Sequence, residues 1–283
     1  MSEALQGKVA LVTGANTGIG EVTARELAAR GMRVFLACRS AEKADAARAR
    51  VLAAVPGARV ETHALDLSTL AATRRSAEAF LAKDVPLHVL VNNAGLAGQR
   101  GVTADGFEIH FGVNHLAPWL FTLLLEPRLK ESGAARIVNV ASRAHQRVKG
   151  GIDWDALRKP TRTLTGFPEY SVSKLCNVLG SREHARRLAG SDVHTYALHP
   201  GVVASDVWRR VPWPFRALIK LRMISNEEGA RTSVYCATSP DVAADSGRYY
   251  DKSRAVPTAP IGADDALAGE LWRRCEAWAG VGG

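Results

Sequence analysis

The chain has few cysteines and no long apolar run. The first observation argues against a cysteine metal site, and the second argues against a membrane-spanning helix. Its four cysteines are widely separated in 283 residues, which excludes the usual spacing of metal ligands. We therefore expect that the chain binds no metal and that its thiols stay free in a reducing cytosol. The most apolar stretch, residues 116–125, contains Pro118 and Thr122 and is shorter than the ~18 apolar residues of a membrane span. The first six residues lack the regions of a signal peptide, so we expect a cytoplasmic protein without a transmembrane segment.

Aromatic residues are also scarce, at 6%, and they do not interleave with basic residues as they do in proteins that grip nucleic-acid bases. The net charge of +9 therefore does not by itself indicate a nucleic-acid partner. Basic charge also suits an anionic phosphate cofactor or solubility alone. A hydrophobic content of 47% is sufficient for a large buried core.

What the chain does contain is a regular alternation of short apolar runs and helical patterns. The Val- and Leu-rich runs predict strands at 8–13, 33–38, 59–65, 87–92, 135–141 and 193–199. Helices are expected between them, the first ending at Gly31 and the others at 41–54, 70–81, 112–130 and from Tyr170 to about 188. This order is typical of an α/β fold with a doubly wound parallel sheet of about seven strands. No break in composition divides the chain, so residues 1–283 are expected to form a single domain.

The first predicted strand runs directly into a glycine-rich turn that comprises residues 14–20. Gly14, Gly18 and Gly20 allow the backbone to approach a pyrophosphate, and the helix that follows offers free N–H groups to its negative charge. Strand, glycine turn and helix together are the context of a dinucleotide-binding site. The spacing is G-x-x-x-G-x-G rather than G-x-G-x-x-G, so an ordinary turn between strand and helix is the alternative.

The residues after the second predicted strand indicate which dinucleotide would bind. An NAD enzyme needs an acidic side chain there for the ribose hydroxyls, whereas arginine accommodates the 2′-phosphate of NADP. No acid precedes Glu42, and Arg39 offers a planar guanidinium with Ser40 and Lys43 nearby. We therefore predict NADP(H), the alternative for Arg39 being a solvated surface residue.

A tyrosine and a lysine four residues apart, Tyr170 and Lys174, indicate the chemistry. Residues at this spacing share one face of a helix. The lysine charge is expected to lower the pKa of the phenol, which would then exchange protons with a carbonyl or alcohol oxygen. The pattern also arises by chance on surface helices, so its weight comes from the nucleotide-binding signature that precedes it.

Taken together, the motifs resemble the short-chain dehydrogenase/reductase family and its Rossmann-type fold. They occur in the family's order, as Thr13-Gly14-x-x-x-Gly18-x-Gly20, Asn92-Asn93-Ala94-Gly95, Asn114, Ser142, Tyr170-x-x-x-Lys174 and Pro200-Gly201. The segments 37–39, 113–116, 170–177 and 199–201 are similar to those of its retinol-dehydrogenase-like branch.

This resemblance implies a role for each of four catalytic residues. Tyr170 would be the general acid/base, and Lys174 would activate it and bind the nicotinamide ribose. Ser142 would hydrogen-bond the substrate oxygen, with a helix cap as the alternative. Asn114 would hold a kinked helical turn and a water that connects to Lys174, with a buried amide as the alternative.

The resemblance also implies a set of cofactor contacts. Asp66 would contact adenine, unless it caps a helix, and residues 92–95 could instead form a simple turn. Ser205 stands where the family usually has threonine, and its hydroxyl remains available for the carboxamide. The full set is Gly14, Asn16, Thr17, Gly18, Ile19, Gly20, Arg39, Asp66, Leu67, Asn93, Ala94, Gly95, Tyr170, Lys174, Pro200, Gly201, Val203 and Ser205.

The segment after Pro200-Gly201 is rich in apolar bulk and basic charge. At about 204–225 we expect a substrate lid, which suggests a lipophilic aldehyde, ketone or alcohol, retinal-like or otherwise. A core helix and an interfacial helix in peripheral contact with a membrane are the alternatives. Two other functions stay open: a light-dependent protochlorophyllide-type reductase and a non-catalytic NADP-sensing protein. The resemblance further suggests a homodimer or homotetramer packed through the long helices near Asn114 and Tyr170.

Overall fold

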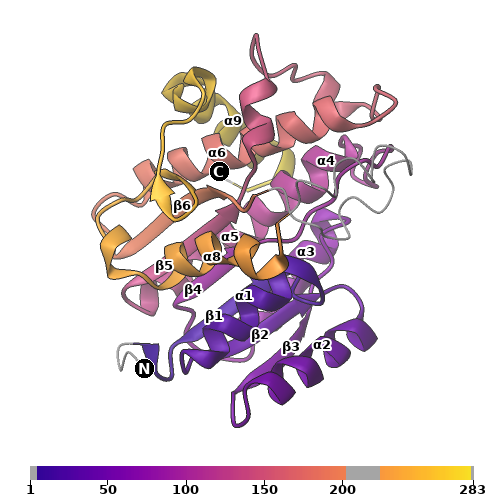
Figure 1. Cartoon of the computed structure of the whole chain (residues 1–283). Coiled ribbons are helices and arrows are strands. Elements are labelled where there is room, and N and C mark those ends of the chain that lie inside the picture. Colours follow the sequence, from indigo (N-terminus) through magenta and orange to yellow (C-terminus); the bar gives the residue numbers. More distant parts are fainter. Residues whose placement is uncertain (1–4, 202–223, 282–283) are drawn as a thin grey trace.

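The computed structural model describes residues 5–201 and 224–281, and one twisted sheet organises them (Figure 1). Its strand order is β3-β2-β1-β4-β5-β6-β7-β8. All neighbours from β3 to β7 are parallel, and β8 is antiparallel to β7. The strands are β1 (Val9–Thr13), β2 (Arg33–Cys38), β3 (Val60–Ala64), β4 (Val89–Asn92), β5 (Ala135–Val140), β6 (Val193–His199), β7 (Tyr249–Asp251) and β8 (Arg254–Ala255). The sheet thus has eight strands where the sequence predicts about seven.

Helices cover both faces of this sheet. The α-helices are α1 (Gly18–Ala29), α2 (Ala41–Ala54), α3 (Leu70–Leu81), α4 (Ile109–Phe111), α5 (Ala117–Glu131), α6 (Phe167–Arg187), α8 (Asn226–Thr238) and α9 (Asp265–Ala279). Shorter 3₁₀ turns are η3 (Arg143–Arg147), η4 (Ala156–Arg158), η6 (Pro240–Val242) and η7 (Pro260–Ala263). No helix in the described part of the chain is both long and apolar enough to cross a bilayer.

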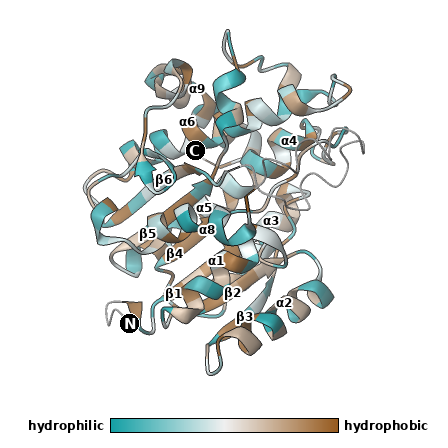
Figure 2. Ribbon diagram, in the orientation of Figure 1, coloured by the Kyte–Doolittle hydropathy of each residue, from teal (hydrophilic) through white to brown (hydrophobic). Residues whose placement is uncertain are grey.

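The two faces have separate cores because side chains alternate along each strand. All five residues of β1 are buried. Val12 packs in a core with residues of α1, α2 and α8, whereas Leu11 packs in a second core with residues of α3 and α5. The hydrophobic colour of the central strands in Figure 2 follows from this two-sided burial. The predicted doubly wound α/β fold is therefore confirmed.

Element boundaries agree best where a strand or cap is explicit in the sequence. The bounds 33–38, 41–54, 70–81 and 193–199 are confirmed, and the other predicted strands are shorter by one or two residues. The helix predicted at 112–130 is correct for α5 but not regular at its start, where the kinked turn expected at Asn114 is a π-turn. A π-turn, η2 (Gly112–Leu116), separates α4 from α5. Pro118 has no N–H to donate to the carbonyl of Asn114, so a regular α-helical bond cannot form there.

The C-terminal helix α9 lies against α6, outside the sheet. Trp272 of α9 meets Trp119 of α5 at a ring separation of 5.2 Å, and Arg182 of α6 pairs with Asp265 at 2.6 Å. The outer side of α6 is thus covered by the chain's own last helix. The strand order also places β1 between β2 and β4, and the crevice of a doubly wound sheet opens at such a reversal.

Candidate active site

A cavity of about 910 Å³ lies at the carboxyl ends of the parallel strands. It brings together residues from every predicted motif except Asn114. Of the predicted cofactor contacts, those that line it are Gly14, Asn16, Thr17, Gly18, Ile19, Gly20, Arg39, Asp66, Leu67, Asn93, Ala94, Gly95, Tyr170, Lys174, Pro200 and Gly201. Val203, Ser205 and the expected lid up to residue 223 lie outside the described residues.

The glycine turn is built so that side chains would obstruct it. Gly14 and Gly18 have φ values of +65° and +60°, which L-residues with a Cβ rarely adopt. A Cβ on Gly20 would lie 2.4 Å from the Asn93 amide nitrogen and 2.5 Å from the Gly14 carbonyl oxygen. The three glycines therefore allow the turn to pack on the end of β4 and leave its backbone open to the cleft.

Thr13 joins the ends of β1 and β4. Its hydroxyl oxygen accepts hydrogen bonds from the N–H groups of Asn93 and Ala94, each at 2.9 Å. The Asn93 amide donates in return to the Thr13 carbonyl at 2.8 Å. Residues 92–95 thus form more than a simple turn, because they fix the floor of the cleft beside the glycines.

The end of β2 presents polar and basic groups to the cleft. Arg39 and Lys43 are exposed, and the Ser40 hydroxyl caps α2 by accepting from the Lys43 N–H at 3.3 Å. Asp66 follows β3 and accepts from the Ser68 N–H at 3.0 Å. The cap of α3 is Thr69 rather than Asp66, so the helix-cap alternative for Asp66 is wrong.

Tyr170 lies in the first turn of α6, at the end of the cleft near β5. Burial raises the pKa of the phenol to about 12, although the neighbouring Ser142 side chain opposes this shift. Ser142 also caps η3 by accepting from the Ala144 N–H at 3.2 Å. The catalytic and capping interpretations of Ser142 are therefore compatible, since one oxygen serves both contacts.

Lys174 lies one turn further along α6 and is buried. Its Nζ is 5.7 Å from the centre of the Tyr170 ring and donates to the Val140 carbonyl at 2.8 Å. Burial lowers the pKa of Lys174 to about 8. The expected lowering of the Tyr170 pKa by Lys174 is wrong, because desolvation of the phenol outweighs the one opposing influence, which comes from Ser142.

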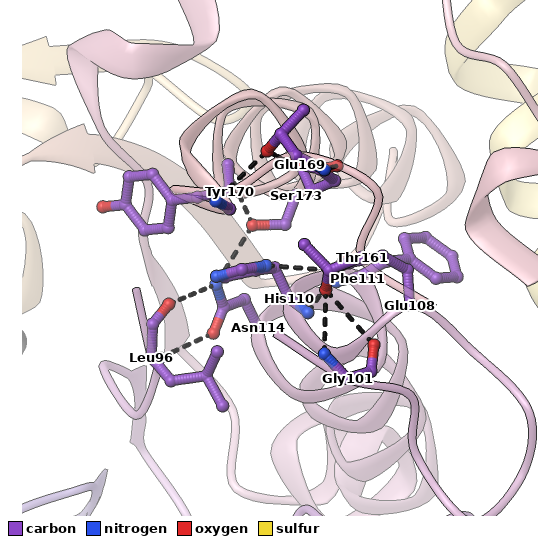
Figure 3. A network of polar contacts seen from close by, with 12 residues as sticks. Leu96, Gly101, Glu108, His110, Phe111, Asn114, Thr161, Glu169, Tyr170 and Ser173 are labelled. Carbon is purple, nitrogen blue, oxygen red and sulfur yellow. Dashed lines mark hydrogen bonds and ion pairs between the residues drawn. The ribbon is translucent and has the colours of Figure 1, made fainter. Parts of the chain in front are cut away.

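Asn114 occupies the π-turn that replaces the predicted regular helix. Its Oδ1 accepts from the Leu96 N–H at 2.8 Å, and its Nδ2 donates to the Leu96 carbonyl and the Ser173 hydroxyl, both at 3.0 Å (Figure 3). A Cβ on Gly95 would lie 3.1 Å from Asn114 Oδ1 and 3.7 Å from Lys174 Nζ. Asn114 is thus a buried amide that ties the chain after β4 to α6, next to Lys174. It lines a small cavity of about 30 Å³ together with His115 and Asn177.

Sequence reasoning missed several residues that line the cleft near Tyr170. The Phe167 ring lies 5.9 Å from that of Tyr170, and Arg147 stacks over Phe167 at 5.3 Å. Phe167 could have been found, because it precedes Tyr170 by three residues on the same helix. Burial lowers the pKa of His199, at the end of β6, to about 4. That effect depends on packing that the sequence does not show.

Comparison with known proteins agrees with this geometry. The family model for short chain dehydrogenases matches residues 8–154. The chain belongs to the short-chain dehydrogenase/reductase family of oxidoreductases, whose members use a nicotinamide cofactor.

Within this family the chain is similar to retinol dehydrogenase 12 of Homo sapiens. The two are 44% identical over 280 residues, which cover 96% of this chain and 86% of that protein. An uncharacterized protein from Mycobacterium paratuberculosis is 32% identical with a TM-score of 0.77, and the match covers 98% of this chain and 95% of that one. The 3-ketoacyl-(acyl-carrier-protein) reductase from Brucella melitensis, in complex with NADH, is 27% identical with a TM-score of 0.67, covering 87% and 97%.

Proposed function

We propose that this chain is an NADP(H)-dependent oxidoreductase that acts on a lipophilic aldehyde, ketone or alcohol. The observation that carries the proposal is that Ser142, Tyr170 and Lys174 line the same cleft as the glycine turn. A nicotinamide bound in this cleft would donate or accept the hydride. The cleft fits such a cofactor because the backbone of the glycine turn, the basic side chains after β2 and the catalytic side chains all line this one cavity.

Tyr170 and Ser142 would act on the substrate oxygen. Because the pKa of Tyr170 is about 12, the phenol holds its proton at neutral pH and can donate it to a carbonyl oxygen. The Ser142 hydroxyl, which lines the cleft with Tyr170, would stabilise the charge that develops on that oxygen. Lys174 would hold a positive charge beside the phenol and bind the ribose, and Asn114 would keep α6 in place.

Loss of the phenol hydroxyl tests this mechanism. In Tyr170→Phe we expect NADPH binding to persist and turnover to fall by about two to four orders of magnitude, because the proton donor is gone. Turnover is measured as NADPH oxidation with retinal, quinones and shorter aldehydes, and binding by nucleotide fluorescence. Near-normal turnover in this variant would exclude Tyr170 as the acid.

The choice of NADP(H) rests on the end of β2. Arg39 lines the cleft and is exposed, and Ser40 and Lys43 lie beside it. A guanidinium can bind a 2′-phosphate through two parallel hydrogen bonds. We expect Arg39→Asp to shift the kcat/KM preference from NADPH toward NADH by about tenfold or more, since a charged hydrogen bond contributes ~1.5–3 kcal/mol. An unchanged preference would contradict the NADP assignment.

A lipophilic substrate is supported by the surroundings of Tyr170. Ala97, Ala144 and Phe167 pack around it and also line the cleft. The relative from Homo sapiens carries the name of a retinol dehydrogenase, which is consistent with an apolar alcohol or aldehyde. We also propose that residues 204–225 close over this wall as a lid. A carbonyl panel without any NADPH oxidation would favour the NADP-sensing alternative, and pigment reduction under light would favour the protochlorophyllide-type reductase.

Two further properties belong to the proposal. All four cysteines are free and buried, which is compatible with a cytoplasmic protein. Association into a homodimer or homotetramer near α5 and α6 would have to involve α9, because α9 already packs on α6. Light scattering of the purified chain would give the assembly's mass, and a monomeric mass would exclude both assemblies.

A further inference from the structure

A buried carboxylate outside the catalytic set connects the two segments that carry Asn114 and Tyr170. Glu108 is 2% exposed and precedes α4. Its Oε2 accepts from the N–H groups of His110 and Phe111 at 2.8 and 2.9 Å. Its Oε1 contacts the His110 Nδ1 at 2.9 Å and accepts from the Thr161 hydroxyl at 2.5 Å. Four partners satisfy this carboxylate, as a buried charge requires.

The first consequence concerns the helical run that presents Asn114. Glu108 is the cap at the start of α4, and α4 continues without a break into the π-turn. Thr161 connects this cap to the loop before α6, since it bonds Glu108 and both the N–H and the carbonyl of Gly101. Figure 3 shows Thr161 and Gly101 joined on one side of His110, and Asn114 with Leu96 on the other. The position of Asn114 therefore depends on the Glu108 cap.

The second consequence concerns the start of α6. His110 is fully buried, and its ring meets the Tyr170 ring edge-on at 6.2 Å. Gly166 is the N-cap of α6, and its carbonyl accepts from the Tyr170 N–H at 2.9 Å. A Cβ on Gly166 would lie 2.7 Å from His110 Cε1. His110 thus packs directly against both the first turn of α6 and the ring that it carries.

The contacts of His110 assign its protonation pattern. An ionised carboxylate can only accept, so a hydrogen bond from His110 Nδ1 to Glu108 requires the tautomer that carries its hydrogen on Nδ1. The Nε2 is buried without a partner among the described residues. The His110 ring therefore contributes its packing surface and a single hydrogen bond, the one between Nδ1 and Glu108. The hydrogen bond holds the ring in a single orientation. A fixed ring can in turn keep the neighbouring Tyr170 phenol in place.

We propose that Glu108 and His110 are positioning residues, which hold Asn114 and Tyr170 in a fixed relation through one buried hydrogen-bonded unit. The inference rests on the proposed function, in which Tyr170 transfers the proton. Neither residue touches the cofactor cleft, so neither contributes to cofactor binding directly. A displacement of about 1 Å at a reacting group can cost about a hundredfold in rate. The effect should therefore fall on kcat.

The test uses variants that separate the ring from its anchor. His110→Phe keeps an aromatic ring but loses the bond to Glu108, and His110→Asn keeps a donor close to the Nδ1 position but loses the ring. We expect kcat for NADPH-dependent carbonyl reduction to fall about tenfold to a hundredfold in both, with KM for NADPH within about twofold of wild type. Thr161→Val, which removes one bond of the unit, should give a smaller loss of about threefold to tenfold and covers the case in which a His110 variant does not fold.

The matched control is a second histidine–glutamate pair, in which the histidine is buried and the glutamate is half-buried. His184, also on α6, bonds Glu126 at 2.8 Å and packs on Trp272, away from Tyr170. His184→Phe should leave kcat within about twofold of wild type. An equal loss of kcat in His184→Phe would show general destabilisation and overturn the proposal.

A double-variant comparison tests whether His110 acts through Tyr170. In the Tyr170→Phe background, His110→Phe should cause no further loss of residual turnover, whereas a separate structural effect would lower the rate equally in both backgrounds. Amide hydrogen exchange of residues 166–173 gives a readout without turnover, and we expect faster exchange in His110→Phe than in His184→Phe. Unchanged exchange, or unchanged kcat in His110→Phe, would overturn the inference. Absence of turnover in the wild type would instead count against the proposed function and leave the exchange comparison decisive for the positioning unit.

Discussion

The glycine turn and the Tyr170 cluster line one cleft, but different kinds of atoms form them. The turn offers backbone, and its shape depends on the absence of side chains at Gly14, Gly18 and Gly20. The Tyr170 cluster consists of buried side chains, and Tyr170 and Lys174 are 9% and 5% exposed. A side chain added to the first region obstructs it, whereas a side chain removed from the second leaves a buried group without support.

This difference indicates which substitutions should disturb each region. The turn is specified within residues 13–20 and by its contact with Asn93, so its geometry is largely local. The Tyr170 cluster needs Val140, Ser142 and the π-turn at Asn114, which are far apart in sequence. Cofactor binding and proton transfer should therefore respond separately to substitution.

The largest effect on the glycine side is expected from Gly20→Ala. The new Cβ would lie 2.4 Å from the Asn93 amide nitrogen and 2.5 Å from the Gly14 carbonyl, so the turn must shift. Overpacking of this kind costs ~1–3 kcal/mol, which corresponds to about fivefold to 150-fold in NADPH affinity if it falls on the cofactor-bound form. Fluorescence titration with NADPH measures it. Gly269→Ala, in α9 with open space around the glycine, is the control and should leave the affinity unchanged. Equal affinities in both variants would contradict the comparison.

A smaller effect, on the catalytic side, concerns pH. Because burial lowers the pKa of Lys174 to about 8, its positive charge is present below that pH and lost above it. If the charge supports proton donation by Tyr170, kcat/KM for carbonyl reduction should be flat below about pH 8 and fall about tenfold per unit above it. Lys174→Arg keeps its charge at high pH, so the fall should move to higher pH. An alkaline limb that stays in place in Lys174→Arg would assign it to another group.

The sequence predicted the local parts of this molecule well. The second strand, 33–38, and the helix at 41–54 have the expected bounds, since the strand is an apolar run and Ser40 caps the helix in the structure. The same locality explains why the glycine turn and Arg39 could be assigned to one cleft, since each directly follows a parallel strand.

The parts that failed depend on contacts between distant segments. The apolar pattern at Gly112–Leu116 continues as in a regular helix, so only the family resemblance indicated a kinked turn there, and its π-helical form depends on the Glu108 cap and Pro118. The sign of the Tyr170 pKa shift was wrong because the burial of a phenol is a tertiary property, whereas the spacing to Lys174 is a local one. His110 carries no recognisable signal in the sequence, since its role depends on the approach of Gly166 and Tyr170.

The smallest expected effect separates stability from chemistry on the cofactor side. Ser40 lines the cleft and caps α2, but its bond to the Lys43 N–H is exposed and 3.3 Å long. Ser40→Ala should therefore lower the free energy of unfolding by only ~0.5–1 kcal/mol, at the low end for a lost cap, as measured by urea denaturation. Ser40 is not among the residues that hold Tyr170 in place, so kcat should stay within about twofold of wild type. KM for NADPH should rise, because Ser40 lines the cleft beside Arg39. A fall in kcat without a change in KM would mean that the cofactor side of the cleft and the Tyr170 cluster are coupled. The two would then not respond separately to substitution.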